Sequence, residues 1–245
     1  TGDFPTSDLG SIDALLCSGE FGITPLPRSG SGMEALRIYV GWDSREPEAY
    51  DVCRSSLKRH SHSPLEIVPI IQGDLRDQGL YHREMDPLAS TEFTYTRFLV
   101  PHLADYTGWA LFCDSDFLWT RDVADLFACQ VDGYAVMCVK HHYRPTETVK
   151  MDGQAQSVYP RKNWSSLMLM NCAHPSTKRL TVDAANYESG AYLHRFQWAY
   201  DSEIGSLDPT WNWLEGWNSP NPDGPVSYTH MTPPTHHTRQ DPRGG

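Results

Sequence analysis

The stretch Trp109–Asp116 reads WALFCDSD and joins an apolar run to two carboxylates. The residues Trp109 to Cys113 are aromatic or aliphatic apart from one thiol, and the run has the length of a β-strand. Asp114 and Asp116 follow it with Ser115 between them. Because side chains alternate with a period of two in extended backbone, the two carboxylates point to the same side. The stretch therefore predicts a buried strand that delivers an acidic pair to a loop.

Outward from this strand, runs with strand character alternate with runs with helix character. Strands are predicted at 36–40, 65–71, 109–113, 134–140 and 166–170, and helices at 47–60, 90–106 and 122–129. In the first helix Ala49, Val52, Cys53, Ser56 and Leu57 share one face, and in the second Pro101 is expected to bend or interrupt the helix.

Such alternation predicts a single α/β domain with a Rossmann-like, mainly parallel mixed sheet flanked by helices on both faces. Ligands of these sheets bind beyond the carboxyl ends of the strands, and both Asp43 and the Asp114/Asp116 pair fall there. Residues 1–35 are predicted to be an irregular lead-in, since Ser29–Gly32 reads SGSG. Residues 233–245, rich in Pro, Thr, His and Gly, are predicted to be an irregular tail, which leaves 36–232 as the domain.

The overall charge restricts the class of partner. The 245 residues include 20 Lys and Arg against 31 Asp and Glu, a formal net charge of −11. Such an acidic chain is a poor match for a nucleic-acid backbone or an anionic membrane. No nucleic-acid partner is therefore expected for this chain. Its longest apolar runs have strand length, which predicts no transmembrane segment. We expect a soluble, cytoplasmic protein.

The six cysteines form no CxxC pair. Cys113 and Cys138 lie inside apolar runs, which favours reduced, buried thiols over a disulfide or zinc framework. This interpretation agrees with a reducing compartment.

The acidic pair has two interpretations. Carboxylate oxygens suit hard cations such as Mn²⁺ or Mg²⁺, which keep coordination positions open for phosphate oxygens. An Asp-x-Asp triplet is expected by chance about once in a chain of this length, and a turn with two solvated acids is the alternative.

Four segments of the chain together resemble the retaining glycosyltransferases of family 8 and their bacterial relatives, which have a GT-A fold. The central one is Thr94–Phe127, TYTRFLVPHLADYTGWALFCDSDFLWTRDVADLF. Arg37–Arg45 (RIYVGWDSR) resembles the first strand and nucleotide-binding loop of that family. Lys162–Asn171 (KNWSSLMLMN) is similar to the strand that lines the donor sugar, and Ser206–Leu214 (SLDPTWNWL) to a late stretch of the domain. The resemblance implies that residues 36–232 form a GT-A catalytic domain.

The resemblance also implies residue roles. Asp43 would face the nucleoside, with an N-cap for the following helix as the alternative, and Arg97 would approach the donor, with a solvated helix face as the alternative. Asp114 and Asp116 would hold the metal. The remaining donor-binding residues implied are Ser115, Lys162, Ser165 and Ser166.

The later part of the chain departs from the family pattern. Asp201-Ser202-Glu203-Ile204 stands where relatives have Asp-Gln-Asp-Ile, so Asp201 is the preferred catalytic acidic group and Glu203 the second, with an acidic turn as the alternative. Relatives place a His on the metal near the end of the domain. Here Ser227 aligns with it, and His230 is the available substitute.

Taken together, these expectations describe metal-dependent transfer of a sugar from a nucleotide-diphosphate donor, with UDP preferred over GDP and with retention of configuration. The acceptor, whether glycan, lipid or protein, is left open. One alternative is a non-catalytic nucleotide-sugar or carbohydrate-binding protein on the same fold, and another is a metal-dependent phosphohydrolase. The tryptophans Trp164, Trp211, Trp213 and Trp217 are candidates for stacking on sugars, although core packing is the more common role.

Overall fold

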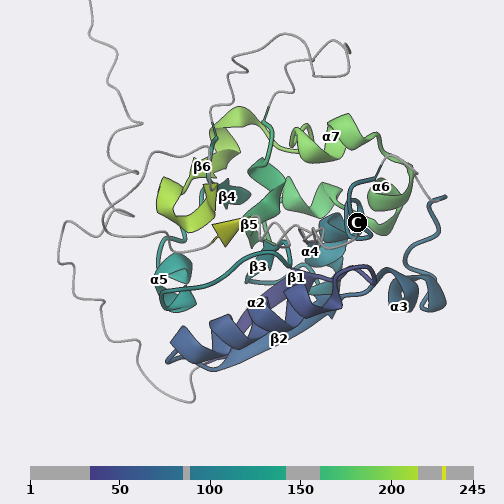
Figure 1. The fold of residues 1–245 in the computed structure, drawn as a ribbon. Helices are drawn as coiled ribbons and strands as arrows, with labels where there is room; N and C mark the ends of the chain where they lie inside the picture. Colours follow the sequence, from purple (N-terminus) through teal and green to yellow (C-terminus); the bar gives the residue numbers. More distant parts are fainter. Residues whose placement is uncertain (1–33, 85–88, 142–160, 215–227, 230–245) are drawn as a thin grey trace, which may run out of the picture.

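The computed structural model describes residues 34–84, 89–141, 161–214 and 228–229. Their backbone forms a six-stranded mixed sheet with helices on both faces, and a separate two-stranded sheet (Figure 1). Residues 1–33 of the predicted lead-in (1–35) and the predicted tail 233–245, together with His230, Ser227 and Trp217, lie outside the described residues.

Six strands form the sheet in the order β2-β1-β3-β5-β4-β6. They are β1 (Leu36–Gly41), β2 (Leu65–Ile70), β3 (Trp109–Cys113), β4 (Val136–Cys138), β5 (Leu167–Asn171) and β6 (Ile204–Ser206). β1 pairs in parallel with β2 and β3, and β4 pairs in parallel with β6. β5 is antiparallel to both of its neighbours, β3 and β4, so it alone runs against the other strands. The mainly parallel mixed sheet predicted from the sequence is confirmed.

Alternation along the strands divides the apolar side chains between two cores. On β3, Ala110 and Phe112 belong to one core and Leu111 and Cys113 to the other, as the period of two requires. The first core lies under α4 (Val100–Leu103), α6 (Val182–Tyr187) and α7 (Gly190–His194). The second lies under α2 (Pro47–His60) and α5 (Val123–Phe127). Both faces of the sheet are therefore covered, and ligands have access to its edges.

Local sequence signals account for the helix ends. α2 begins at Pro47, whose missing N–H costs nothing in the first turn. Asp122, Thr181 and Ser189 cap α5, α6 and α7 through side-chain oxygens that accept from the backbone N–H of Ala124, Ala184 and Tyr192. Within α2, Cys53, Ser56 and Leu57 are buried as predicted. Val52 is exposed, so the buried face of the helix is narrower than predicted.

The segment 90–106, predicted as a helix that Pro101 bends or interrupts, is helical only over residues 96–103, and the type of helix changes beside Pro101. The segment consists of turns, a 3-10 helix η1 (Thr96–Leu99) and the four-residue α4. A proline in a helix interior clashes with the carbonyl four residues earlier, and here that residue is Arg97. Pro101 instead occupies the first turn of α4, and Asp105 and Tyr106 end the segment with positive φ angles of 52° and 53°.

The remaining elements are short. They are α3 (Gln72–Asp77), the 3-10 helices η2 (Trp164–Ser166), η3 (Thr177–Arg179), η4 (Asp201–Glu203) and η5 (Pro209–Asn212), and the paired strands β7 (Trp213–Leu214) and β8 (Tyr228–Thr229). Five cysteines of the described part are free thiols, and all but Cys129 are buried, which agrees with the predicted reduced state. No helix among the described residues has the length and apolar character needed to span a membrane.

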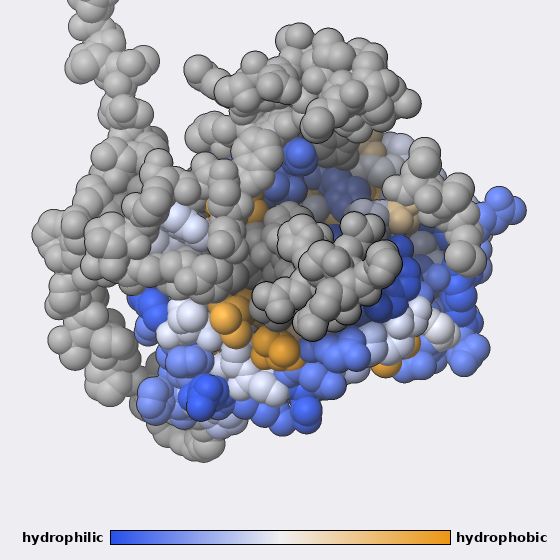
Figure 2. All heavy atoms as spheres, in the orientation of Figure 1, coloured by the Kyte–Doolittle hydropathy of each residue, from blue (hydrophilic) through white to orange (hydrophobic). Residues whose placement is uncertain are grey.

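The surface seen in Figure 2 is largely hydrophilic, with small apolar areas between polar ones. Among the described residues the large hydrophobic side chains that remain exposed are Val52, Val131, Tyr187 and Tyr200.

Candidate functional site

A cavity of about 230 Å³ lies where the strands β1 and β3 end. Its lining combines residues that follow β1, residues that precede η1 and the acidic triplet that follows β3. They are Asp43, Arg45, Glu46, Ser90, Thr91, Phe93, Asp114, Ser115 and Asp116. The cavity thus unites Asp43 with Asp114, Ser115 and Asp116, four of the residues singled out from the sequence.

The sheet register explains this meeting. β1 and β3 are neighbours, and Val40 pairs with Cys113 in the parallel direction. Both strands therefore end at the same edge of the sheet. Asp43 follows Val40 by three residues, and Asp114 follows Cys113 directly. Two segments about 70 residues apart in sequence come together because parallel strands present their carboxyl ends to one edge.

Asp43 is held by the residues around it. Its carboxylate accepts hydrogen bonds from Arg45 Nε (2.8 Å), Arg45 Nη2 (2.6 Å) and the backbone N–H of Glu92 (3.1 Å). The hydrogen bonds from the Arg45 side chain are the main cause that lowers the pKa of the Asp43 carboxyl. The alternative prediction that Asp43 caps the following helix is wrong, because Glu46 is the N-cap residue of α2.

Arg97 lies beneath the cavity and pairs with Asp114. Its side chain is 6% exposed, and Nη1 donates to Asp114 Oδ1 at 2.7 Å and to the Ser165 carbonyl at 2.8 Å. The solvated helix face considered for Arg97 is therefore wrong. Burial raises the pKa of the Asp114 carboxyl to about 7, the Arg97 cation opposes that rise, and the negative charge of Asp116 adds to it.

The two serines at the start of β5 are engaged within the protein. Ser165 Oγ lies 2.8 Å from His194 Nδ1. Ser166 Oγ donates to the Asn163 carbonyl and accepts from Asn212 Nδ2, both at 2.8 Å. Neither serine lines the cavity, and neither does Lys162. The backbone of Ser166 nevertheless supports the site, since its carbonyl accepts from the Asp114 N–H at 2.9 Å.

Glu203 lies at the opposite edge of the sheet. Its carbonyl accepts from the Ala135 N–H, and the Ala135 carbonyl accepts from Asn171, which pairs with Trp109 at the start of β3. Asp114 lies five residues after Trp109, which at about 3.3 Å per residue separates the two levels by about 16 Å. The structure therefore does not bring Glu203 to the cavity. Its carboxylate instead accepts from Ser176 Oγ at 2.6 Å, which is the main cause of a lowered pKa, and from the Tyr200 N–H at 3.0 Å.

Asp201 is a surface residue. Its side chain is 86% exposed and forms an ion pair with Arg161, and it does not line the cavity. The β6 strand begins at Ile204, directly after the Asp-Ser-Glu triplet. Asp201 as a catalytic group remains a prediction.

Two of the tryptophans have mainly packing roles. Trp211 is 2% exposed and belongs to the second core. Trp164 is half-buried, with Lys140 and Arg161 each near its ring at 5.9 Å and 5.2 Å from the ring centroid. The core role that the sequence favoured is confirmed for Trp211.

The donor set of the cavity suits a hard divalent cation. Asp114 and Asp116 supply carboxylate oxygens, and they lie close enough that the charge of Asp116 contributes to the raised pKa of Asp114. A cation relieves such repulsion, and oxygen ligands are those that Mn²⁺ and Mg²⁺ accept. Within the described residues no group of three His, Cys, Asp or Glu side chains is arranged to hold a metal. The two carboxylates of Asp114 and Asp116 therefore fit a divalent cation. His230 as a third protein ligand remains a prediction.

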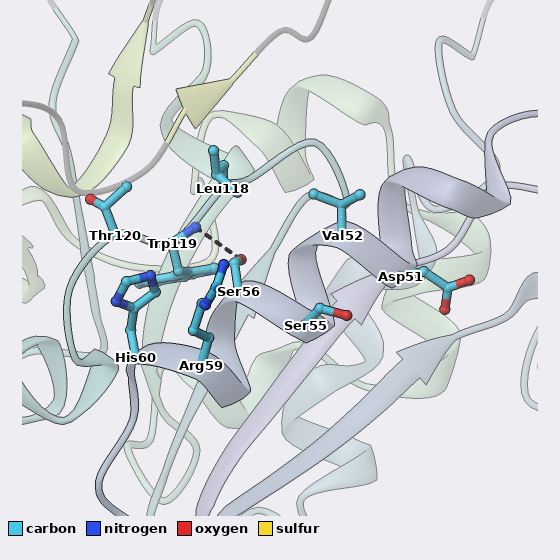
Figure 3. A pocket seen from close by; sticks show the side chains of 9 residues that line it. All are labelled: Asp51, Val52, Ser55, Ser56, Arg59, His60, Leu118, Trp119 and Thr120. Carbon is cyan, nitrogen blue, oxygen red and sulfur yellow. Dashed lines mark hydrogen bonds between the residues drawn. The ribbon is translucent and has the colours of Figure 1, made fainter.

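A second, larger depression of about 570 Å³ lies between α2 and the residues after β3 (Figure 3). From α2 it is lined by Asp51, Val52, Ser55, Ser56, Arg59 and His60, and from the other side by Leu118, Trp119 and Thr120. Ser56 Oγ, which donates to the Cys53 carbonyl, accepts from the Trp119 N–H at 3.0 Å and so joins the two walls. None of the residues predicted to bind donor or metal lines this depression, so the smaller cavity is the candidate site.

Two residues of the site were missed in the sequence. Arg45 lies inside the quoted RIYVGWDSR segment but was given no role, although its side chain is 59% exposed at the cavity. His194 carries no local motif, and contacts with residues far away in the sequence, such as Ser165 29 residues before it, bring it near Arg97. The placement of Arg45 could have been inferred from its motif, whereas that of His194 could not.

A curated relative matches the chain over most of its length. Protein CDI of Arabidopsis thaliana is 52% identical over 212 residues, which cover 86% of this chain and 81% of that protein. The chain belongs to the CDI protein family. No protein-family model matches this member of the CDI family.

Solved structures show which fold the CDI family member shares. The glycosyltransferase GlyE of Streptococcus pneumoniae TIGR4 superposes with a TM-score of 0.50 at 17% identity, covering 81% of this chain and 55% of GlyE. The chain thus spans about half the length of GlyE. Mouse xyloside xylosyltransferase 1 superposes with a TM-score of 0.51 at 11% identity, covering 81% of this chain and 98% of that one. The fold is that of the GT-A glycosyltransferases, as the sequence predicted. At these identities the likeness establishes the fold, and membership of family 8 remains a prediction.

Proposed function

We propose that this protein is a glycosyltransferase that moves a sugar from a nucleotide-diphosphate donor to an acceptor with the help of a divalent cation. One observation carries the proposal. The Asp43 loop and the Asp114-Ser115-Asp116 triplet line a single cavity at the carboxyl edge of a GT-A sheet.

The residues of the cavity divide into two groups by charge. Asp114 and Asp116 would hold Mn²⁺ or Mg²⁺, and such a cation neutralises the charge that develops on a leaving diphosphate. Asp43, fixed by Arg45 and Glu92, would accept a hydrogen bond from the base or ribose. Arg45 is an exposed cation on the same wall, which makes it the candidate for a direct phosphate contact.

Arg97 would act from below the cavity. Its guanidinium neutralises Asp114 and is fixed by the Ser165 carbonyl, so it holds that carboxylate in one orientation.

UDP is the preferred nucleotide and GDP the second choice.

Retention of configuration is part of the proposal, by front-face attack of the acceptor rather than through a covalent sugar intermediate. Asp201 is the proposed acidic group toward the sugar. Glu203 is not included, because its carboxylate already accepts hydrogen bonds from Ser176 Oγ and the Tyr200 N–H, whereas that of Asp201 is exposed.

A second candidate is a non-catalytic binder of nucleotide sugars on the same fold. Two observations favour it: Asp114 is already neutralised by Arg97, and Glu203 lies away from the cavity. The two candidates differ in one outcome, because an enzyme releases free sugar or glycosylated product from the donor and a binder does not.

The test compares Asp116→Asn with Asp125→Asn. Asp116 lines the cavity, whereas Asp125 is an exposed residue of α5 whose side chain is 60% exposed. Thermal-shift titration with UDP and Mn²⁺ should show stabilisation of the wild type and of Asp125→Asn, since a ligand at 100 times its Kd adds about 2.7 kcal/mol. Asp116→Asn should lose most of this stabilisation.

Donor hydrolysis measured on the same three proteins separates the candidates. An enzyme predicts Mn²⁺-dependent release of sugar by the wild type and a loss of about 100-fold or more in Asp116→Asn. Stabilisation by UDP without any release of sugar would favour the binding protein. The absence of both, or an unchanged Asp116→Asn, would refute the proposed site.

A further inference from the structure

His194 connects the two segments of chain that hold Arg97. The residue ends α7, and its Nδ1 lies 2.8 Å from Ser165 Oγ. The imidazole also forms a hydrogen bond with the backbone of Thr94, three residues before Arg97. Ser165 supplies the carbonyl that accepts from Arg97 Nη1, and Phe93, beside Thr94, supplies the carbonyl that accepts from Arg97 Nε.

The contacts fix the tautomer of His194. The hydrogen bond with the Thr94 backbone acts to raise the pKa of His194, which is the effect of an accepting carbonyl, so the ring nitrogen that faces Thr94 carries the hydrogen. Burial is the main cause that lowers the pKa of His194 to about 3, and the cations of Arg97 and Arg83 add to it. The imidazole is therefore neutral, its Nδ1 is an acceptor, and the Ser165 hydroxyl donates to it.

Aromatic packing holds the ring in this orientation. The His194 ring packs against the fully buried Phe98 ring in a T-shaped contact, with centroids 5.0 Å apart and an interplanar angle of 83°. Tyr95 lies on another side, with its centroid at 6.1 Å. The ring thus joins α7, the segment from Thr94 to Phe98 at the start of η1, and η2.

We propose that His194 is a positioning residue that, through Thr94 and Ser165, holds Arg97 against Asp114 and so fixes the metal-binding carboxylate. This inference rests on the proposed function, for which Asp114 is a ligand of the cation. It assigns a role to a residue that contacts neither donor nor metal.

A Ser–His nucleophile pair is the competing interpretation of the same contact. A general base must accept a proton, but the nearby cations of Arg97 and Arg83 disfavour an imidazolium at this position. Ser165 is 7% exposed and does not line the cavity. The positioning role therefore agrees better with the charges around the ring.

The experiment uses two substitutions of His194 and one control. His194→Phe keeps a ring beside Phe98 but removes both hydrogen bonds, whereas His194→Gln retains one donor and one acceptor. His62→Phe is the control, because the His62 side chain is 94% exposed and bonds only to Asp122 among the described residues. Calorimetry with UDP and Mn²⁺ should show binding weakened about tenfold in His194→Phe, the effect of one misplaced charged contact. His194→Gln should recover affinity to within about threefold of wild type, and His62→Phe should match wild type.

A second readout is independent of the function. Side-chain ¹⁵N spectra, with Arg97 assigned from Arg97→Met, should show the bonded guanidinium signals of Arg97 in wild type and His194→Gln. The same signals should shift or broaden in His194→Phe. If wild type binds no nucleotide, the proposed function fails while this spectrum still decides the role of His194. Unchanged Arg97 signals in His194→Phe, or equal UDP affinity in a folded His194→Phe, would overturn the inference. Equal loss in His194→Phe and His194→Gln, with Arg97 signals intact, would do the same and indicate the nucleophile pair.

Discussion

Asp114 is subject to opposing influences from its neighbours. Burial and the charge of Asp116 favour its neutral form, and Arg97 at 2.7 Å favours its anion. A buried ion pair of this kind is expensive to break from one side, because the remaining charge is left uncompensated. At the residue scale, the state of the candidate metal site is thus set by groups that the Asp-x-Asp motif does not contain.

His194 allows a stability prediction at this scale. Its pKa is about 3 in the folded protein, against an ordinary value of 6.5, so below pH 6.5 the unfolded chain binds a proton that the folded chain does not. The free energy of unfolding should therefore fall as the pH is lowered, and this one group contributes about 2 kcal/mol of loss between pH 7.5 and 5.

Urea denaturation at a series of pH values measures this contribution. Both His194→Gln and His194→Phe lack the titrating group, so both should lose about 2 kcal/mol less than wild type over that range. Agreement between the two variants separates titration from hydrogen bonding, which only Gln retains. Parallel pH curves for all three proteins would contradict the pKa shift.

At the scale of elements, the segment before β3 shows how one residue changes a helix. In a helix interior the Pro101 ring would clash with the carbonyl of Arg97, four residues earlier. Residues 90–106 instead consist of turns, η1 and α4. The turns place Ser90, Thr91 and Phe93 on the cavity, and η1 places Arg97 beneath it. In a continuous helix Ser90, Phe93 and Arg97 would share one face, but Thr91 would point about 100° away from Ser90.

Gly41 provides a prediction about the packing of β1 against this segment. A Cβ at Gly41 would lie 2.5 Å from Phe93 Cδ2, and Phe93 is 2% exposed. Gly41→Ala should therefore destabilise the fold by about 1–3 kcal/mol and displace the Phe93 ring that lines the cavity.

The matched control is Gly73→Ala in α3. A Cβ there meets nothing within 4 Å, so alanine should stabilise the protein by about 0.5–1 kcal/mol through its helix propensity. Urea midpoints of the two variants should move in opposite directions. A Gly41→Ala protein as stable as wild type would show that Phe93 can shift at little cost.

For the whole molecule, the sheet and the net charge matter most. The carboxyl edge of the sheet collects Asp43, Asp114 and Asp116, and the chain as a whole carries a net charge of −11. An acidic background attracts small cations and repels a free diphosphate, so the proposed cation would be needed before the donor can bind well.

Salt dependence tests this effect of the whole molecule. The apparent affinity for Mn²⁺ should fall by about two- to tenfold between 0.02 and 0.3 M NaCl, because salt screens the exposed acidic groups. Fluorescence or calorimetric titration of wild type and Asp116→Asn provides the measurement. An affinity that does not change with NaCl would mean that local ligands alone determine binding.

The amino-acid sequence by itself determined the parts of this protein that depend on near neighbours. The strands β1, β2 and β3, the helix α2 and the acidic pair after β3 follow from runs of apolar residues, a proline and a period of two. The site at the ends of β1 and β3 could also be predicted, because parallel strands share a carboxyl edge.

Only the tertiary structure decided the contacts that join distant segments. The antiparallel direction of β5, the position of Glu203 at the far edge, and the Arg97–Ser165 and Ser165–His194 hydrogen bonds depend on residues up to 68 positions apart. Such pairings cannot be predicted from local sequence, because they form only when packing of the two cores brings the chain segments together. The sequence therefore indicated which residues carry the proposed chemistry, and packing decided which partners hold them in place.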